Sequence, residues 1–126
     1  LQTQFSPQIT KTAGKFIKRM TQSRYDIVQL EKGMSVSARE AGGIASHPIA
    51  ALSGGTMDQM YLAIRLAICE HVLPTGTPLV LDDALVYFDD VRMVQALQLL
   101  QAISQTRQVL LFSCQTREAA WQKQSN

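Results

Sequence analysis

Two aspartates, Asp82 and Asp83, directly follow a short apolar stretch in the segment LVLDD. Ligands of open α/β sheets gather at the carboxyl ends of parallel strands. An acid placed directly after a buried strand is costly unless it meets a cation or hydrogen-bond donors. Mg²⁺ carrying nucleotide phosphates would satisfy Asp82, and Asp83 could then orient or deprotonate an attacking water. The alternative is that both acids merely cap the next turn.

A second candidate site is the turn Ser53-Gly54-Gly55, which stands directly before a long apolar run. Backbone N–H groups are free at a helix start, the helix dipole is positive there, and absent side chains let a phosphate come close. Many such turns only cap a helix, so the signal is weak by itself. The segment is also close to the nucleophile elbow of hydrolases, but that motif needs a preceding strand and a histidine after the acid. Both histidines, His47 and His71, precede Asp82, which excludes the hydrolase interpretation.

Length and composition fit one globular domain, residues 1–126, with 46% apolar residues and a net charge of +2. The basic residues Lys11 to Arg24 form a stretch without acids, for which a solvated helix face is the ordinary interpretation. Cys69 and Cys114 lack metal-ligand spacing and predict two buried thiols in a reducing cytoplasm. No signal peptide or membrane span is visible, and a first residue Leu1 instead of Met predicts a piece of a longer protein.

Apolar periodicity predicts an α/β fold with a short parallel sheet, flanking helices and an N-terminal β-hairpin. Helices are expected at 8–22, 55–72, 91–105 and 116–123, a hairpin around Lys32-Gly33, a loop at 40–51, and strands in LVLDD and RQVLLFS. The apolar runs of these two strands are typical of strands covered on both faces. Strand, helix and strand in this order predict a right-handed crossover. The helix at 91–105 is expected to turn Val91, Val94, Leu97, Leu100 and Ile103 inward.

Taken in order, LSGGTMDQ, LVLDD, YFDD and QVLLFSC closely resemble the C-terminal half of an ABC-type ATPase head. The likeness is to the SMC-like and RecF-like coiled-coil ATPases of DNA repair and chromosome maintenance, and within them to the YhaN-like AAA proteins of bacteria. It spans residues 8–120. It implies that 1–24 are the end of a coiled coil, 25–39 a hairpin, and 50–124 the core with the motifs.

The resemblance also implies a role for each motif residue. Leu52, Ser53, Gly54 and Gly55 would be the signature motif, in which Ser53 and the Gly55 N–H contact the γ-phosphate of ATP held by a partner head. Asp82 would be the Walker B acid that holds Mg²⁺ through water, and Asp89 the D-loop acid at the dimer interface. Asp83 stands where the family usually has a catalytic glutamate. Gln115 takes the place of the switch histidine, although an ungapped alignment puts Cys114 there. Arg65 matches a basic position thought to couple nucleotide state to the coiled coil.

The phosphate cradle itself is absent from this sequence, since a P-loop needs G-x-x-x-x-G-K-[ST] and Gly14-Lys15 does not fit that pattern. The resemblance therefore implies three partners: an N-terminal P-loop lobe of the same protein, a second head, and DNA by family likeness alone. The chain should be inert without them. The leading hypothesis is half of an ATP-hydrolysing head. The alternative, suggested by Asp83 and Gln115, is a non-hydrolysing dimerisation module gated by ATP.

Overall fold

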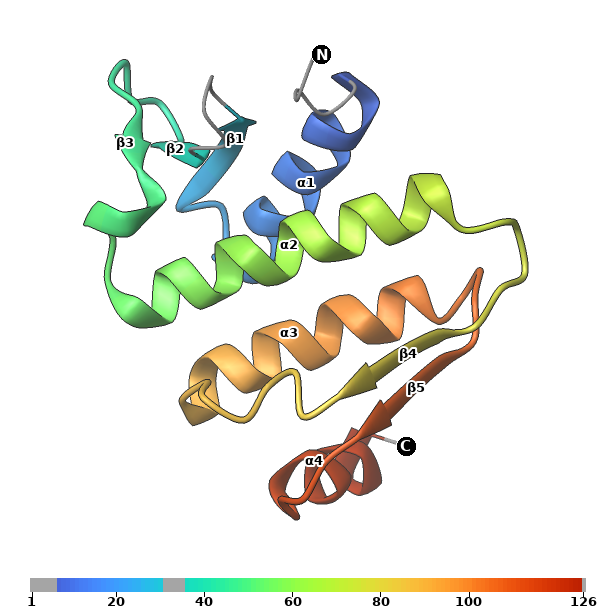
Figure 1. Ribbon diagram of the computed structural model, residues 1–126. Helices are drawn as coiled ribbons and strands as arrows, with labels where there is room; N and C mark the ends of the chain where they lie inside the picture. Colours follow the sequence, from blue (N-terminus) through green and yellow to red (C-terminus); the bar gives the residue numbers. More distant parts are fainter. Residues whose placement is uncertain (1–6, 31–35, 126) are drawn as a thin grey trace.

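The computed structural model describes residues 7–30 and 36–125, and it folds into four α-helices and two small sheets (Figure 1). The elements in chain order are α1 (Pro7–Met20), β1 (Tyr25–Leu30), β2 (Val36–Glu40), β3 (His47–Pro48), the 3₁₀ turn Ile49–Ala51, α2 (Gly54–Val72), β4 (Leu79–Asp82), α3 (Asp90–Ile103), β5 (Val109–Phe112) and α4 (Arg117–Ser125). These elements confirm the predicted α/β class, with a short parallel sheet, flanking helices and an N-terminal hairpin.

The long helix α2 runs through the middle of the molecule (Figure 1). In the view of Figure 1, α1 and the first sheet lie above α2, and α3 with the second sheet lies below it, while α1 also contacts α3 directly. Gly14 in α1 allows close packing against β1, because a Cβ at this position would come within 2.7 Å of the Asp26 carbonyl oxygen. Gly14 is therefore a packing residue in the middle of α1.

The predicted hairpin is confirmed by antiparallel pairing of β1 with β2, from Tyr25 opposite Glu40 to Leu30 opposite Val36. Its predicted turn, Lys32-Gly33, lies outside the described residues. The prediction of a loop across 40–51 is wrong at its end. There His47–Pro48 pairs with Ser37–Ala38 as a third strand, and a 3₁₀ turn follows directly. Small and proline residues still allow extended pairing at a sheet edge, where a proline needs no ladder hydrogen bond.

Helix α2 begins where the sequence predicts, because Ser53 caps it. The Ser53 Oγ accepts a hydrogen bond from the Thr56 N–H at 3.2 Å, which satisfies one of the unpaired donors of the first turn. The helix is buried on most sides, between the two halves of the molecule. Its buried residues are Thr56, Gln59, Met60, Leu62, Ala63, Ile64, Leu66 and Ala67.

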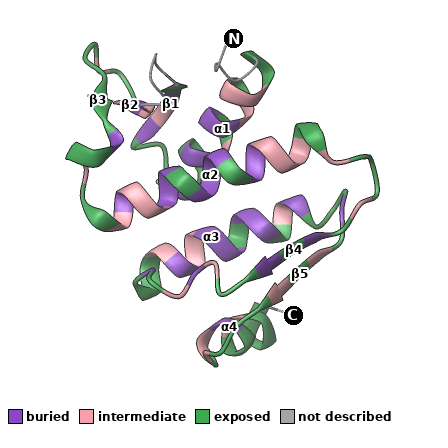
Figure 2. Cartoon of the chain, viewed as in Figure 1, coloured by how far each residue is buried: buried purple, intermediate pink, exposed green. Residues whose placement is uncertain are grey.

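The second sheet consists of β4 and β5, which run parallel with Leu81 opposite Leu111, and α3 connects them. The predicted strand-helix-strand connection between parallel strands is thus confirmed. The prediction that both faces are covered is wrong: Leu79 and Leu81 are buried toward α3, but Val80 is 58% and Phe112 is 56% exposed. Side chains of a strand alternate between faces, and within the described residues α3 covers one face of this sheet (Figure 2).

Helix α3 lies between α2 and the second sheet, so it buries residues on two sides (Figure 1). Leu97, Leu100 and Ile103 point inward as predicted, and Val94 is half-buried. Val91 contradicts the prediction, because it lies in the first turn and is 68% exposed. Other residues of this helix are buried without having been predicted: Met93, Ala96 and Leu99.

Candidate functional site

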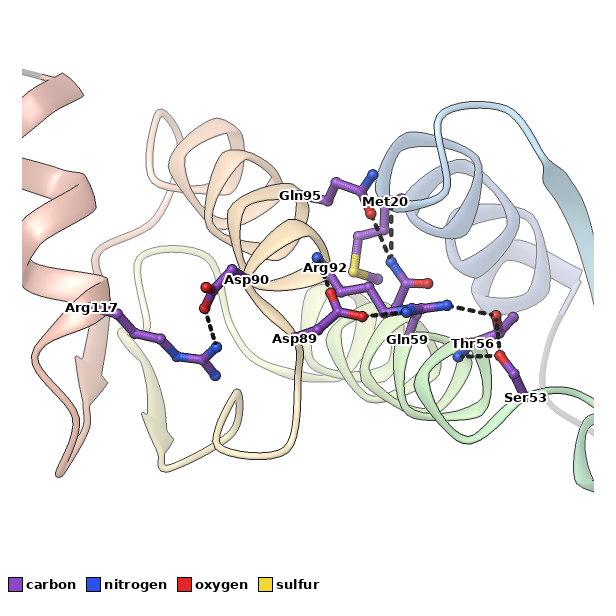
Figure 3. Close-up of polar contacts among 9 residues, drawn as sticks. All are labelled: Met20, Ser53, Thr56, Gln59, Asp89, Asp90, Arg92, Gln95 and Arg117. Carbon is purple, nitrogen blue, oxygen red and sulfur yellow. Dashed lines mark hydrogen bonds and ion pairs between the residues drawn. The ribbon is translucent and has the colours of Figure 1, made fainter.

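The predicted signature segment, Leu52 to Gly55, consists of the two residues after the 3₁₀ turn and the first two residues of α2. Leu52 is half-buried against the core, whereas Ser53 and Gly54 are exposed. The Ser53 hydroxyl accepts from the Thr56 N–H and also donates to Thr56 Oγ1 at 2.8 Å (Figure 3). Gly54 and Gly55 are the first two residues of the helix. The N–H groups of a first helical turn have no partner within the helix, so this arrangement can receive an anion.

The two glycines of this segment differ in what surrounds them. A Cβ on Gly55 would lie 2.7 Å from both Cζ and Nε of Arg92, so the guanidinium of Arg92 packs where a side chain would stand. A Cβ on Gly54 would meet no atom of the described residues within 4 Å. Packing against Arg92 therefore accounts for Gly55, while no packing contact accounts for Gly54.

Asp89 is the N-cap of α3 and is connected to the predicted signature segment through Arg92 (Figure 3). Its carboxylate accepts from the Arg92 N–H at 2.8 Å and from Arg92 Nη1 at 2.5 Å. The Arg92 guanidinium also donates to Thr56 Oγ1 at 3.5 Å. The hydrogen bond from the Arg92 backbone N–H is the main cause that lowers the pKa of Asp89 from its ordinary value. The structure thus brings the predicted D-loop acid and the predicted signature serine into one polar network.

The aspartate pair lies at the carboxyl end of the parallel sheet, as predicted. Asp82 is the last residue of β4, and Asp83 follows it. Both are exposed, so the expected cost of burying an acid after this strand does not arise. Asp83 has a positive φ of 51°, and its Oδ1 accepts a hydrogen bond from the Cys114 N–H at 3.0 Å. Asp83 therefore connects the end of β4 to the segment after β5.

The segment after β5 is organised by Arg117, the first residue of α4. The Arg117 Nε donates to Gln115 Oε1 at 2.8 Å, Nη1 to Asp90 Oδ1 at 2.9 Å, and Nη2 to the Leu85 carbonyl oxygen at 2.9 Å. The half-buried Gln115, predicted at the switch position, is thus bonded through its amide oxygen, and Arg117 ties it to the start of α3. Figure 3 shows the pair of Arg117 and Asp90 across the gap between these helices.

The two cysteines differ from the prediction of buried thiols. Cys69 is half-buried, and Cys114, the alternative residue for the switch position, is exposed. The hydrogen bond of the Cys114 thiol with the Asp83 carboxylate is the main cause that raises the pKa of Cys114. The reason for the exposure is the place of Cys114, which comes after the last residue of β5 and before α4, at an open end of the sheet.

Sequence reasoning missed the two arginines that hold these segments together, Arg92 and Arg117. For Arg92 a local signal existed, since an arginine three residues after an N-cap aspartate can pair with it. Each arginine also has a partner more than thirty residues away in the sequence, Thr56 for Arg92 and the Leu85 carbonyl for Arg117. The predicted coupling residue Arg65 lies exposed on α2.

Among the described residues, no group of three or more His, Cys, Asp and Glu side chains could hold a metal ion. Nor does this part of the chain contain a helix long and apolar enough to cross a membrane.

Solved structures share this architecture. A structure described as structural biochemistry of ATP-driven dimerization and DNA stimulated activation of SMC ATPases aligns with a TM-score of 0.74 and 18% identity, over 90% of this chain and 71% of that chain. The SMC head domain from Thermotoga maritima aligns with a TM-score of 0.74 and 22% identity, over 91% of this chain and 40% of that chain. The fold is that of part of an SMC ATPase head.

Further comparisons agree with this fold. The Smc head of Pyrococcus furiosus with an extended coiled coil, bound to the C-terminal domain of ScpA, aligns with a TM-score of 0.66 and 19% identity, over 90% of this chain and 29% of that chain. The uncharacterized protein YhaN of Bacillus subtilis is 34% identical over 111 residues, which are 86% of this chain and 11% of YhaN. The chain thus spans a small part of this curated relative. No family model matches the sequence. The predicted resemblance to SMC-like heads and to YhaN is confirmed.

Proposed function

We propose that this chain is the C-terminal half of an ATP-binding and ATP-hydrolysing head that completes its active site in a dimer. The observation that carries the proposal is Gly54. Glycine is a poor residue for a helix. Neither a positive φ nor a neighbouring atom within 4 Å requires glycine at this position. A phosphate held by another molecule, approaching the first turn of α2, would require the absence of a side chain there.

In this proposal, Leu52 to Gly55 form the signature motif, and Asp89 is the D-loop acid beside it. The network through Arg92 and Thr56 supports this assignment, because it fixes both segments relative to each other at the starts of α2 and α3. The N-terminal ends of both helices favour negative charge. The partner head would present ATP to this edge of the molecule.

Asp82 is proposed as the Walker B acid. Its exposed carboxylate fits Mg²⁺, which binds through oxygen ligands and usually through one or two carboxylates together with water and phosphates. When bound, this ion would neutralise charge that develops on the phosphates. Asp83 would orient the attacking water, with one oxygen held by the Cys114 N–H. Gln115 would hydrogen-bond the γ-phosphate or that water.

The phosphate cradle is proposed to come from an N-terminal P-loop lobe of the same protein. Support comes from the apolar face of the second sheet that the described residues leave exposed, formed by Val80, Leu110 and Phe112. An exposed apolar patch of this kind is typical of a surface that another segment covers. By analogy with the SMC ATPases whose DNA-stimulated activation is described, DNA is proposed as a partner of the complete protein.

The alternative is a head that dimerises with ATP and does not hydrolyse it. Two contacts favour it: Asp83 Oδ1 already accepts from the Cys114 N–H, and Gln115 Oε1 already accepts from Arg117. A multiple-turnover ATPase assay on heads that contain both lobes separates the two functions. Turnover supports hydrolysis, whereas ATP-bound dimers without turnover support the alternative.

The proposal is tested by Ser53→Arg in a head that contains both lobes. Arginine would occupy the space at the start of α2 that the partner's phosphate must enter, so ATP-driven dimerisation should be lost while the monomer still binds nucleotide. The control is Ser104→Arg, which places the same side chain at an exposed position directly after the C-terminal end of α3. Analytical ultracentrifugation with ATP measures both. Dimers of the Ser53→Arg head equal to those of the control would contradict the proposal.

A further inference from the structure

The Arg92 side chain contacts both Gly55 of the predicted signature segment and the predicted D-loop acid Asp89. Its Nη1 is bound to Asp89 Oδ2, and its Nη2 lies 3.5 Å from Thr56 Oγ1, which in turn accepts from Ser53. The guanidinium also covers the Cα of Gly55, at the position a Cβ would take. The side chain is 28% exposed, so most of it lies between α2 and α3.

This placement joins two helix ends that would otherwise repel each other. The N-terminal ends of α2 and α3 both carry positive partial charge. Asp89 compensates that charge at α3 and also pairs with the positive Arg92 guanidinium, which donates to Thr56 Oγ1 at the start of α2. One turn further along, Gln59 Nε2 donates to Gln95 Oε1 at 3.1 Å and ties the same two helices (Figure 3).

We propose that Arg92 is a positioning residue, which holds Ser53 to Gly55 at a fixed place relative to Asp89 so that both can meet one nucleotide on a partner head. This inference rests on the proposed function. It assigns Gly55 a second role: its missing side chain makes room for Arg92 on one side while its N–H remains available for a phosphate.

The residue must be arginine for this role. The planar guanidinium carries five N–H donors in a fixed geometry, so it can bond a carboxylate and a hydroxyl at once while its face lies on a Cα. A lysine ammonium keeps the charge, but it is not planar and its N–H donors are not fixed in the geometry that bonds two acceptors at once. Arg92→Lys is therefore expected to behave like a loss of the contact rather than a conservative change.

The first test measures ATP-driven dimerisation and monomer nucleotide binding in heads that contain both lobes. Arg92→Met and Arg92→Lys should each weaken dimerisation by about tenfold or more, the equivalent of one hydrogen bond to a charged group. Nucleotide affinity of the monomer should stay unchanged, because Arg92 positions residues that meet the nucleotide of the partner head and not that of its own head. The control Arg19→Met removes an exposed arginine in the last turn of α1, and it should change neither quantity. Normal dimerisation of both Arg92 variants would overturn the inference and leave the proposed function intact.

The second test measures the contact itself by thermal unfolding of the same heads. Gly55→Ala places a methyl group against the guanidinium, so its effect on the melting temperature should be less favourable with Arg92 than in the Arg92→Met background. Gly54→Ala is the matched control, and its effect should be the same in both backgrounds, since its Cβ meets no described atom. Equal effects of Gly55→Ala in both backgrounds would overturn the inference. If the unmodified head fails to dimerise with ATP, the proposed function is wrong. The dependence of the Gly55→Ala effect on Arg92 would then still show whether the guanidinium packs against Gly55.

Discussion

Asp83 can be tested by substitutions that separate its backbone role from its chemistry. The residue has a left-handed φ of 51°, and its carboxylate accepts from the Cys114 N–H at 3.0 Å. Asn is tolerated in this conformation, and its amide oxygen can accept the same hydrogen bond. Asp83→Asn thus keeps the structure and removes the charge.

The structure gives the size of each effect. The left-handed conformation costs a residue with a Cβ about 1–2 kcal/mol, and an exposed hydrogen bond contributes about 1 kcal/mol. Asp83→Ala bears at least the first cost and loses the second contribution, so unfolding free energy should fall by about 1 kcal/mol or more. Asp83→Gly loses the bond but relieves the conformation, so the two effects should nearly cancel. Asp83→Asn should stay within about 0.5 kcal/mol of the unmodified protein.

The effects of these substitutions on ATP turnover should not follow their effects on stability. If Asp83 orients the attacking water, Asp83→Asn should lower hydrolysis by about 10²-fold or more, the usual worth of a general base. ATP-bound dimers should accumulate at the same time, because hydrolysis is slow and the negative charge that would repel the γ-phosphate is removed. The assays are chemical denaturation and steady-state ATPase activity of heads with both lobes. Unchanged turnover of Asp83→Asn, together with a less stable Asp83→Ala, would refute the catalytic role and leave Asp83 as a structural residue.

Three further predictions concern other residues. Asp82→Asn should weaken Mg²⁺-dependent ATP binding, because that carboxylate would anchor the water shell of the ion; titration calorimetry with and without Mg²⁺ measures it, and equal affinities would contradict the Walker B assignment. Gln59→Leu should lower unfolding free energy by about 1–3 kcal/mol, because the buried Gln59 amide donates to the Met20 carbonyl oxygen at 3.1 Å and leucine leaves that oxygen unpaired; no change in the denaturation midpoint would show that water replaces the contact. Asp83→Asn should also speed alkylation of Cys114 near pH 8, because the carboxylate raises the pKa of the thiol and its removal increases the thiolate fraction; mass spectrometry of iodoacetamide labelling would contradict this if the rate fell.

Local patterns in the sequence were sufficient for most elements of the fold. The helical period and Ser53 predict α2 to within one residue of its start, and the crossover from β4 through α3 to β5 follows from the order of the elements. Which segment covers each face of the β4–β5 sheet could not be predicted, because a continuous apolar run indicates burial without indicating the segment that packs on it. Val80 and Phe112 belong to such runs, yet among the described residues no segment covers them.

The candidate site was predicted as separate motifs, and its connections were not. Local patterns point to Ser53 through a turn and to Asp83 through a strand end, and the resemblance to ATPase heads points to Asp89. The arginines that connect these positions bind partners far away in the chain, such as Thr56 for Arg92 and the Leu85 carbonyl for Arg117. Side-chain contacts at that separation depend on how the helices pack, which no local period encodes. The exposure of Cys114 has the same origin, since it depends on where β5 ends in the sheet.

The most direct test of the central claim asks whether this chain serves a nucleotide held by another molecule. One head with both lobes carries Ser53→Arg, and a second carries alanine in place of the P-loop lysine of its other lobe. Neither should dimerise with ATP alone, because the first cannot receive a partner's phosphate and the second cannot hold one. Mixed, they retain one intact composite site, so native mass spectrometry should show ATP-dependent heterodimers. Absence of heterodimers, under conditions in which the unmodified head dimerises with ATP, would contradict the account.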